Sequence, residues 1–156
     1  AQKITKAVKK YAKQPVIMKL SPNVTSIAEM AKAVGAGGAD AVSLINTITG
    51  MKIDIRRKTF LLANRTGGVS GPAIHPIAVR MVYEAANAVK VPVIGMGGIA
   101  SAEDAIEMIL AGASAVSVGT ANFYDPAVTM EIVDGIEDYM KEQGFETVAE
   151  MVGIVK

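Results

Sequence analysis

The sequence predicts an α/β fold with a parallel β-sheet. Four short and continuously apolar runs, residues 16–20, 41–45, 91–95 and 115–119, are separated by stretches with helical periodicity. Parallel strands covered on both faces have this continuous apolar pattern, and each needs a crossover to reach the next strand. The chain has 156 residues, 51% of them hydrophobic and 20% charged, which suits one domain and argues against disorder.

An internal repeat indicates how many strand–helix units the chain holds. Pro15-Val16-Ile17 and residues 38–43 recur as Pro92-Val93-Ile94 and residues 112–117. Each copy is one strand–helix–strand unit, so two copies make half of an eight-stranded TIM (β/α)8 barrel, which has about 250 residues when complete. We therefore expect residues 1–156 to be a single partial domain of about four βα units.

The helices between the strands have recognisable start signals. Residues 1–13 carry apolar residues at helical spacing among five lysines and are expected to end a crossover helix. Ser26-Ile27-Ala28-Glu29 has the spacing of a capping box, and Ser101 can cap a later helix that has two acidic residues in its first turn. Residues 128–140 and 147–155 are predicted to be closing helices.

One connection is much longer than the others. Residues 46–75 separate the second apolar run from a helical pattern that opens near Pro76. Long connections of this kind are usually lids or binding loops, or else disordered. We expect the basic part around residues 54–58 to be a solvated hairpin or turn, and the glycine-rich residues 67–73 to lie against a ligand.

Two glycine-rich turns follow the last two predicted strands. They are Gly95-Met96-Gly97-Gly98 and Gly119-Thr120-Ala121-Asn122. Glycine lets backbone N–H groups approach an anion closely, and phosphate sites of (β/α)8 barrels form from the loops after strands seven and eight. Either turn alone could be an ordinary tight turn, but the two after consecutive strands predict a phosphate site.

The first of these turns also fits a dinucleotide-binding pattern. Residues 95–100 match G-x-G-x-x-A, which in a Rossmann fold is followed by an acidic residue about 20 positions later. The next predicted strand, residues 115–119, contains no acidic residue. The sequence therefore disfavours a Rossmann fold.

Polar side chains stand at the ends of the first two strands. Lys19 either extends to the rim of the sheet or faces a ligand anion, because an unpaired buried ammonium is costly. Asn46 and Thr47 follow the second strand, where they are either turn residues or hydrogen-bonding partners of a substrate. His75, the one histidine, precedes Pro76 and is expected to be structural or at the surface rather than a base.

Composition argues against several other function classes. The chain has no cysteine, which excludes disulfides, thiolate metal sites and a cysteine nucleophile within it. Sixteen basic and 15 acidic residues give a net charge of +1, which argues against nucleic-acid binding. The longest uncharged stretch, residues 108–124, is too short and interrupted to span a membrane, and no signal segment opens the sequence. We expect a cytoplasmic protein with no metal site.

Five motifs carry a resemblance to a known family, and they follow one another along nearly the whole chain. They are Lys19-Leu20-Ser21-Pro22-Asn23, Ile45-Asn46-Thr47, residues 66–73, Gly95-Met96-Gly97-Gly98 and residues 119–123. Together they resemble class 1 dihydroorotate dehydrogenase, above all the catalytic subunit of the NAD-linked 1B type. The resemblance implies an oxidoreductase and flavoprotein of pyrimidine biosynthesis, an FMN-dependent barrel of which this chain is the C-terminal half.

The resemblance also implies roles for residues near the cofactor. Lys19 would contact the flavin ring and stabilise the negative charge that develops there during hydride transfer. Ile45 and Gly71 would line the flavin site. The FMN phosphate would be bound by four residues of the two turns, which are Gly97, Gly98, Gly119 and Thr120.

In such a barrel the residues Asn46 and Thr47, which would bind the substrate, and the catalytic base come from different halves. By the resemblance, Asn46 and Thr47 would hydrogen-bond the ring of dihydroorotate or orotate. The family's base is a cysteine in the first half of the barrel, which takes the C5 proton while C6 delivers hydride to the flavin. No catalytic residue is therefore expected in this chain, since the base would lie upstream of Ala1, and the chain alone is expected to be inactive.

The resemblance implies partners as well. A complete 1B-type enzyme has a second subunit with FAD and an iron–sulfur cluster that passes electrons to NAD. Half a barrel leaves open strand edges, so we also expect pairing with the missing N-terminal half-barrel or a homo-oligomer. Two alternatives stay open: a phosphate-binding TIM-barrel isomerase or synthase without flavin, and a non-catalytic half-barrel that self-associates.

Overall fold

A four-stranded parallel sheet forms the centre of the molecule. The computed structural model describes residues 1–155, so Lys156, the last residue of the predicted domain, lies outside the described residues. The strand order is β1-β2-β7-β8, and every neighbouring pair is parallel. The four strands are β1 (Ile17–Lys19), β2 (Ala41–Leu44), β7 (Val93–Met96) and β8 (Ala115–Ser117). The predicted α/β fold is confirmed.

The strands are slightly shorter than the apolar runs that predicted them, and β7 shows why. The predicted run began at Val91, whereas β7 begins at Val93. Pro92 has no N–H to donate to a sheet, although its carbonyl accepts a hydrogen bond from Val42 N–H at 3.0 Å. Proline therefore ends the hydrogen-bonded part of the strand on one side.

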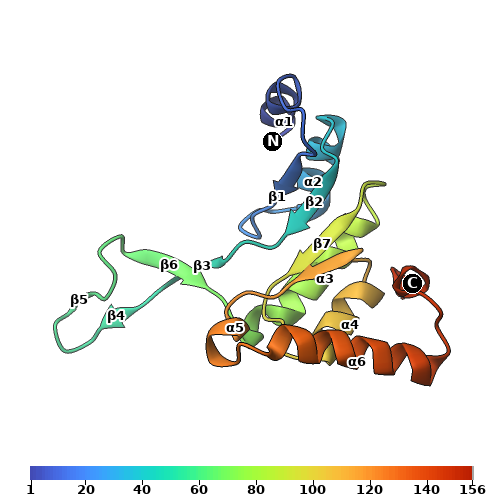
Figure 1. Cartoon of the computed structure of the whole chain (residues 1–156). Helices are drawn as coiled ribbons and strands as arrows, with labels where there is room; N and C mark the ends of the chain where they lie inside the picture. Colours follow the sequence, from blue (N-terminus) through green and yellow to red (C-terminus); the bar gives the residue numbers. More distant parts are fainter. Residues whose placement is uncertain (156) are drawn as a thin grey trace.

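Three helices cover one face of this sheet (Figure 1). They are α2 (Ile27–Ala36), α3 (His75–Ala86), which follows the short 3₁₀ turn η1 (Pro72–Ile74), and α4 (Ala102–Leu110). Both N-caps are present, but the predicted capping box at Ser26 is only half formed: Ser26 accepts a hydrogen bond from Glu29 N–H, while the Glu29 carboxylate accepts one from Lys32. Ser101 forms a reciprocal capping box with Asp104. The apolar core lies between the helices and the sheet, and its fully buried side chains include Val34, Val42, Leu44, Val82 and Met108.

The ends of the chain add helices around this core. At the start, α1 (Gln2–Lys9) packs against α2. At the end come α5 (Ala121–Tyr124), α6 (Val128–Gln143), which packs against α4, and α7 (Val148–Met151). The prediction of a helix over residues 147–155 is too long. After α7 the chain turns at Gly153 (φ +69°), and Gly153 N–H donates to Ile109 O of α4 at 3.1 Å instead of continuing a helix.

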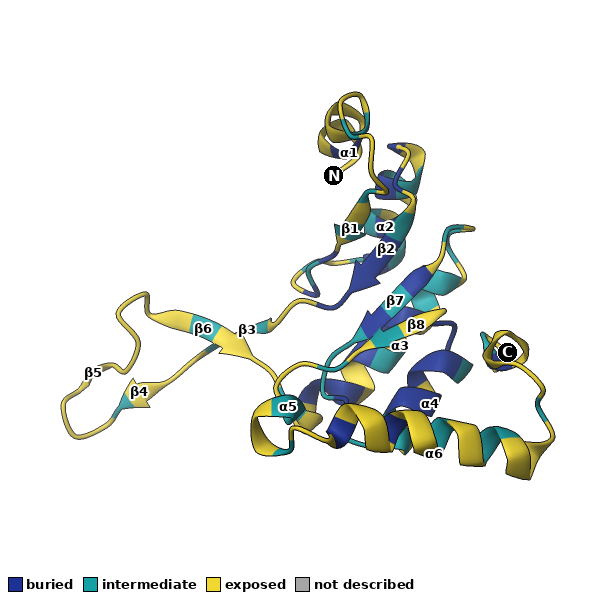
Figure 2. Ribbon diagram, in the orientation of Figure 1, coloured by how far each residue is buried: buried dark blue, intermediate teal, exposed yellow. Residues whose placement is uncertain are grey.

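The second face of the sheet is open at both edge strands (Figure 2). On β1, Ile17 is 51% exposed and Lys19 is also exposed, and at the opposite edge Ala115 and Ser117 of β8 are exposed. Half of a barrel leaves its inner sheet face open in this way, so the exposure agrees with the expected half-barrel. The helices pack against one face only, and no element of the described chain covers these side chains of β1 and β8.

A long arm, residues 48–69, extends away from the sheet (Figure 1). In it β3 (Ile48–Met51) pairs antiparallel with β6 (Thr66–Val69), and β4 (Ile53–Asp54) pairs antiparallel with β5 (Thr59–Phe60). The predicted basic hairpin is confirmed. Its turn is held by Asp54 Oδ1, which accepts hydrogen bonds from the N–H groups of Arg56 and Arg57 at 3.0 Å each.

An ion pair joins α1 to the start of the sheet. The Lys9 ammonium donates to both carboxylate oxygens of Asp40 at 2.7 and 2.9 Å, and Val16 N–H donates to the same carboxylate at 2.6 Å. The hydrogen bonds from Lys9 and Val16 hold the pKa of the Asp40 carboxyl below its ordinary value.

Within residues 1–155, no helix is both long enough and apolar enough to cross a membrane.

Candidate functional site

The carboxyl ends of the parallel strands meet at one edge of the sheet, and backbone hydrogen bonds tie the segments that follow them. Asn46 N–H donates to Leu20 O at 3.1 Å, and Ile45 N–H donates to Met96 O at 2.9 Å. The peptide bond between Leu44 and Ile45, at the end of β2, is cis. The segments after β1, β2 and β7 are thus side by side, at the edge where ligands of parallel sheets bind.

A cavity of about 780 Å³ opens at this edge. Its volume lies within the range of ordinary ligand sites. It is lined by all nine residues predicted to bind cofactor or substrate, which are Lys19, Ile45, Asn46, Thr47, Gly71, Gly97, Gly98, Gly119 and Thr120. The structure therefore brings together residues from five separate stretches of the chain.

The glycine turn after β7 is tightly packed against α3. Gly97 and Gly98 have φ values of +133° and +73°, which residues with a Cβ rarely adopt. A Cβ on Gly97 would lie 2.9 Å from the Cβ of Ala78, and one on Gly98 would lie 2.7 Å from Gly71 O and 2.9 Å from the Cβ of His75. This turn requires glycine for the backbone path and for the packing.

The glycine turn after β8 is open. Gly119 is exposed, and a Cβ built on it would meet no atom within 4 Å. The turn is held by Asn122, whose Nδ2 donates to Val118 O at 3.1 Å and to Gly119 O at 3.0 Å. Nothing in the packing of residues 1–155 therefore demands glycine at position 119.

Both turns leave backbone donors free. In the part of the chain that the structure describes, the N–H groups of Gly98, Gly119 and Thr120 donate no hydrogen bond. All three residues line the cavity. Backbone N–H groups gathered around a concave site are typical of anion binding, so this end of the cavity is suited to a phosphate.

Lys19 supplies the positive charge of the cavity. It is the last residue of β1, it is exposed on the open face of the sheet, and it pairs in register with Ser43 of β2. Among the described residues, no carboxylate lies within ion-pair distance of its ammonium group. Lys19 lines the cavity with its charge unpaired, which agrees with both alternatives left by the sequence.

Asn46 and Thr47 are held in place from two sides. Asn23 Nδ2 donates to Thr47 O at 3.0 Å, and Thr49 N–H donates to Asn23 Oδ1 at 2.9 Å. On the other side, the Thr47 side chain packs so closely on Gly68 of the arm that a Cβ there would overlap it. The two hydrogen bonds of the Asn23 side chain hold this short polar segment, which lines the cavity.

The motifs and the site are matched by known proteins. A family model described as "Dihydroorotate dehydrogenase" matches residues 1–140. This chain belongs to the dihydroorotate dehydrogenase family. The resemblance predicted from the five motifs is thereby confirmed.

Several members of the dihydroorotate dehydrogenase family are close in sequence. The protein named "Dihydroorotate dehydrogenase B (NAD(+)), catalytic subunit" from Lachnoclostridium phytofermentans is 63% identical over 149 residues, and that from Alkaliphilus oremlandii is 62% identical over 152. A Bacteroides fragilis protein with the same name is 54% identical over 153 residues. These matches cover 96%, 97% and 98% of this chain but 50% of each relative, so the chain spans about half the length of the curated relatives it matches.

The cavity of this family member also contains groups that the sequence reasoning missed. Asp125 and Glu131 bring carboxylates to its lining, and Met96 and Ile99 add apolar surface. Asp125 is engaged locally, since its Oδ1 accepts a hydrogen bond from Ala127 N–H at 2.8 Å. The position of Asp125 just beyond the second glycine turn is the one sequence signal that could have indicated it. Within residues 1–155, no three His, Cys, Asp or Glu side chains are placed to hold a metal ion.

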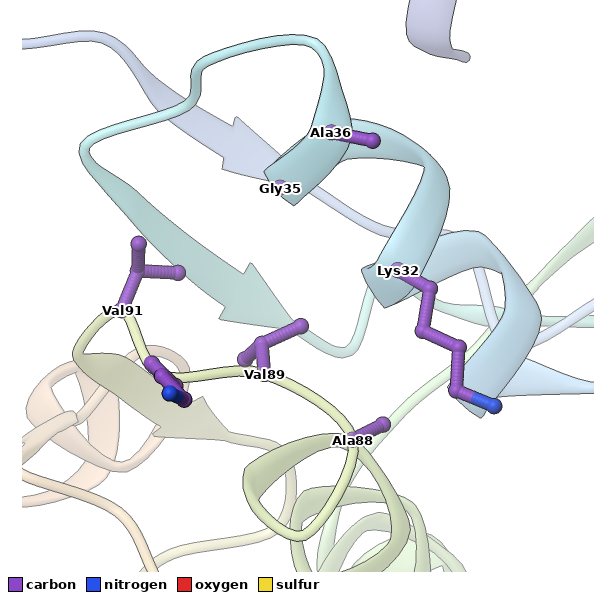
Figure 3. A pocket seen from close by; sticks show the side chains of 7 residues that line it. Lys32, Gly35, Ala36, Ala88, Val89 and Val91 are labelled. Carbon is purple, nitrogen blue, oxygen red and sulfur yellow. The ribbon is translucent and has the colours of Figure 1, made fainter.

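A second, smaller cavity of about 280 Å³ lies near the opposite end of the strands (Figure 3). It is formed by the end of α2 and by the segment that precedes β7, residues 88–91. Lys32, one of its lining residues, has its ammonium paired with Glu29 at 2.9 Å. None of the residues predicted to bind cofactor or substrate lines this cavity.

Proposed function

We propose that this chain is the C-terminal half of the catalytic subunit of a 1B-type dihydroorotate dehydrogenase, which oxidises dihydroorotate to orotate in pyrimidine biosynthesis. The observation that carries the proposal is the single cavity lined by all nine residues of the predicted flavin and substrate sites. Residues 1–156 form one partial domain in this proposal, and the names of the relatives support the reaction.

The residues of the cavity fit FMN. Its free N–H groups at Gly98, Gly119 and Thr120 suit a phosphate, and its apolar residues suit a planar ring. These apolar side chains include Ile45, which is 4% exposed and packs beside Gly97, and Ile74, which is also 4% exposed. FMN bound there would accept a hydride from the substrate.

Three polar residues that line the cavity have distinct tasks in this proposal. Lys19 places an ammonium group beside the flavin ring, where it stabilises negative charge that develops during hydride transfer. Asn46 and Thr47 hydrogen-bond the substrate ring and orient its C6 toward the flavin. Asn23 keeps the backbone of Thr47 in place for this contact.

The proton acceptor lies outside this chain, because the chain has no cysteine. We propose that an N-terminal half-barrel covers the open face of the sheet and supplies this base. A subunit with FAD and an iron–sulfur cluster would carry the electrons to NAD, and the complete protein would be a cytoplasmic homo-oligomer. The name shared by the relatives, a catalytic subunit linked to NAD, supports such a partner.

The test uses the full-length subunit, in which this chain supplies the half that matches the relatives. The wild-type subunit should bind FMN and show bleaching of the flavin absorbance when dihydroorotate is added without oxygen. Lys19→Ala should slow this flavin reduction on the order of 100-fold, the usual effect of removing one electrostatic stabiliser. Stopped-flow absorbance measures the rate.

Lys13→Ala is the matched control, because Lys13 is an exposed lysine remote from the cavity lining. It should leave the rate unchanged. A wild-type subunit that binds phosphate but no FMN would contradict the proposal and favour the isomerase or synthase alternative. Flavin reduction in Lys19→Ala at the wild-type rate would contradict the role of Lys19.

A further inference from the structure

His75 lies behind the cavity wall and is used by none of the roles proposed above. It is the first residue of α3, it is 5% exposed, and it does not line the cavity. Its Nδ1 lies 2.9 Å from Gly97 O, and its Nε2 lies 3.0 Å from Glu107 Oε2 of α4. One buried ring thus joins the glycine turn after β7 to two helices.

The chemistry of the two partners fixes which atoms donate. A carbonyl oxygen and a carboxylate only accept hydrogen bonds, so both ring nitrogens donate when both bonds are present. The doubly protonated imidazolium ring makes both bonds. The neutral ring with its proton on Nδ1 keeps the bond to Gly97 O alone.

The bond to Gly97 O sets the orientation of the next peptide group. In a planar trans peptide the C=O of one residue and the N–H of the next point in opposite directions. Because the Gly97 carbonyl points at the buried imidazole ring, the N–H of Gly98 points to the side away from it. Gly98 lines the cavity, and its N–H donates no hydrogen bond within residues 1–155.

Contacts on both sides of the peptide group between Gly97 and Gly98 prevent it from shifting, so rotation is the main movement left to it. Gly98 lies against Gly71 O and His75, and the following N–H groups of Ala100 and Ser101 donate to Asp104 Oδ2 at 2.9 and 3.1 Å. Asp104 therefore holds the far end of the turn, and His75 holds its centre. Without the imidazole, Gly97 O would be a partly buried acceptor with no donor from the protein, which favours rotation of the peptide.

We infer that His75 is a positioning residue for the anion-binding turn: it holds the Gly97 carbonyl so that Gly98 N–H faces the phosphate of the cofactor. The inference rests on the proposed function, since it concerns the FMN phosphate. His75 touches neither the cofactor nor the substrate in this arrangement. Substitution of His75 should therefore weaken the binding of FMN and leave the binding of riboflavin, which has no phosphate, unchanged.

The test compares the affinities of the full-length subunit for FMN and for riboflavin. His75→Phe keeps a flat ring and removes both donors, and it should raise the Kd of FMN about tenfold, the effect of about one hydrogen bond to a charged ligand. The Kd of riboflavin should stay within about twofold of wild type, because the substitution removes no contact to the flavin ring. Quenching of flavin fluorescence measures both constants.

Two further variants separate positioning from general stability. His75→Asn places an amide N–H near the position of Nδ1 and should restore the FMN affinity to nearly that of wild type. Glu107→Gln changes only the second partner of the ring and should leave the FMN affinity unchanged, because the bond to Gly97 O remains. Circular dichroism checks that each variant is folded.

Three results would overturn the inference. They are an FMN affinity unchanged in His75→Phe, equal losses of FMN and riboflavin in that variant, and a failure of His75→Asn to restore FMN binding. Failure of the proposed function is a different result, because the wild-type subunit itself would then not bind FMN.

Discussion

The two glycine-rich turns look alike in the sequence and differ sharply in the structure. After β7, Gly97 and Gly98 have positive φ values and are packed against α3, η1 and the Cβ of His75. After β8, Gly119 is exposed, and a Cβ on it would meet no atom. Both turns nevertheless offer free N–H groups to the same cavity.

The difference shows that glycine serves two separate purposes at this site. In the turn after β7 it allows a backbone path and a close contact that a larger residue cannot share. In the turn after β8 the fold places no atom near Gly119, so glycine there serves only to keep the backbone N–H groups accessible to a ligand. Alanine substitutions in the two turns should therefore separate stability from ligand binding.

The largest effect on stability is expected for Gly98→Ala. Its Cβ would lie 2.7 Å from Gly71 O and 2.9 Å from the Cβ of His75, at a φ of +73°. Positive φ and overlap with a backbone oxygen together should cost about 3 kcal/mol or more. Urea unfolding of the full-length subunit measures the loss, and a stability within the error of wild type would show that the turn is not packed as described.

Gly71→Ala tests the backbone conformation without the overlap. Gly71 has a φ of +100° and a ψ of −176°, a region that is essentially restricted to glycine, but its Cβ would meet no atom within 4 Å. Strain alone should lower the free energy of unfolding by about 1–2 kcal/mol. A loss as large as that of Gly98→Ala in the same urea experiment would mean that the overlap contributes nothing.

The smallest effect on stability is expected for Gly119→Ala. No positive φ and no overlap oppose the methyl group, so the free energy of unfolding should change by less than about 0.5 kcal/mol. The methyl group would stand among the free N–H groups, so the Kd of FMN should rise about tenfold while that of riboflavin stays the same. Loss of stability without loss of FMN affinity would reverse the contrast between the turns.

Much of the site could be predicted because its residues follow the strands in sequence. Lys19, Asn46 and Gly119 stand at or just after apolar runs, and parallel strands bring such positions to one edge. Asn23 was visible as part of a motif, but its two bonds to the segment after β2 depend on how the loop folds back. The burial of His75 against Gly97 and Glu107 joins positions 22 and 32 residues apart, which no local pattern indicates.

The apolar runs likewise do not indicate which segment covers the second face of the sheet. An apolar run shows that a strand has a face to bury, but it does not say which chain segment covers it. Within residues 1–155 the helices cover one face, and Ile17 remains 51% exposed on the other.

The sequence by itself determined the α/β order and the helix caps at Ser26 and Ser101, because each depends on short-range spacing. The nine predicted residues that line the cavity were indicated by motifs and by the family resemblance they carry. Tertiary structure alone decided which glycine turn is closely packed and which is open, and it alone placed an imidazole against the first. Those features depend on contacts between α3, α4 and the segment after β7, and such contacts exist only once the helices have packed on the sheet.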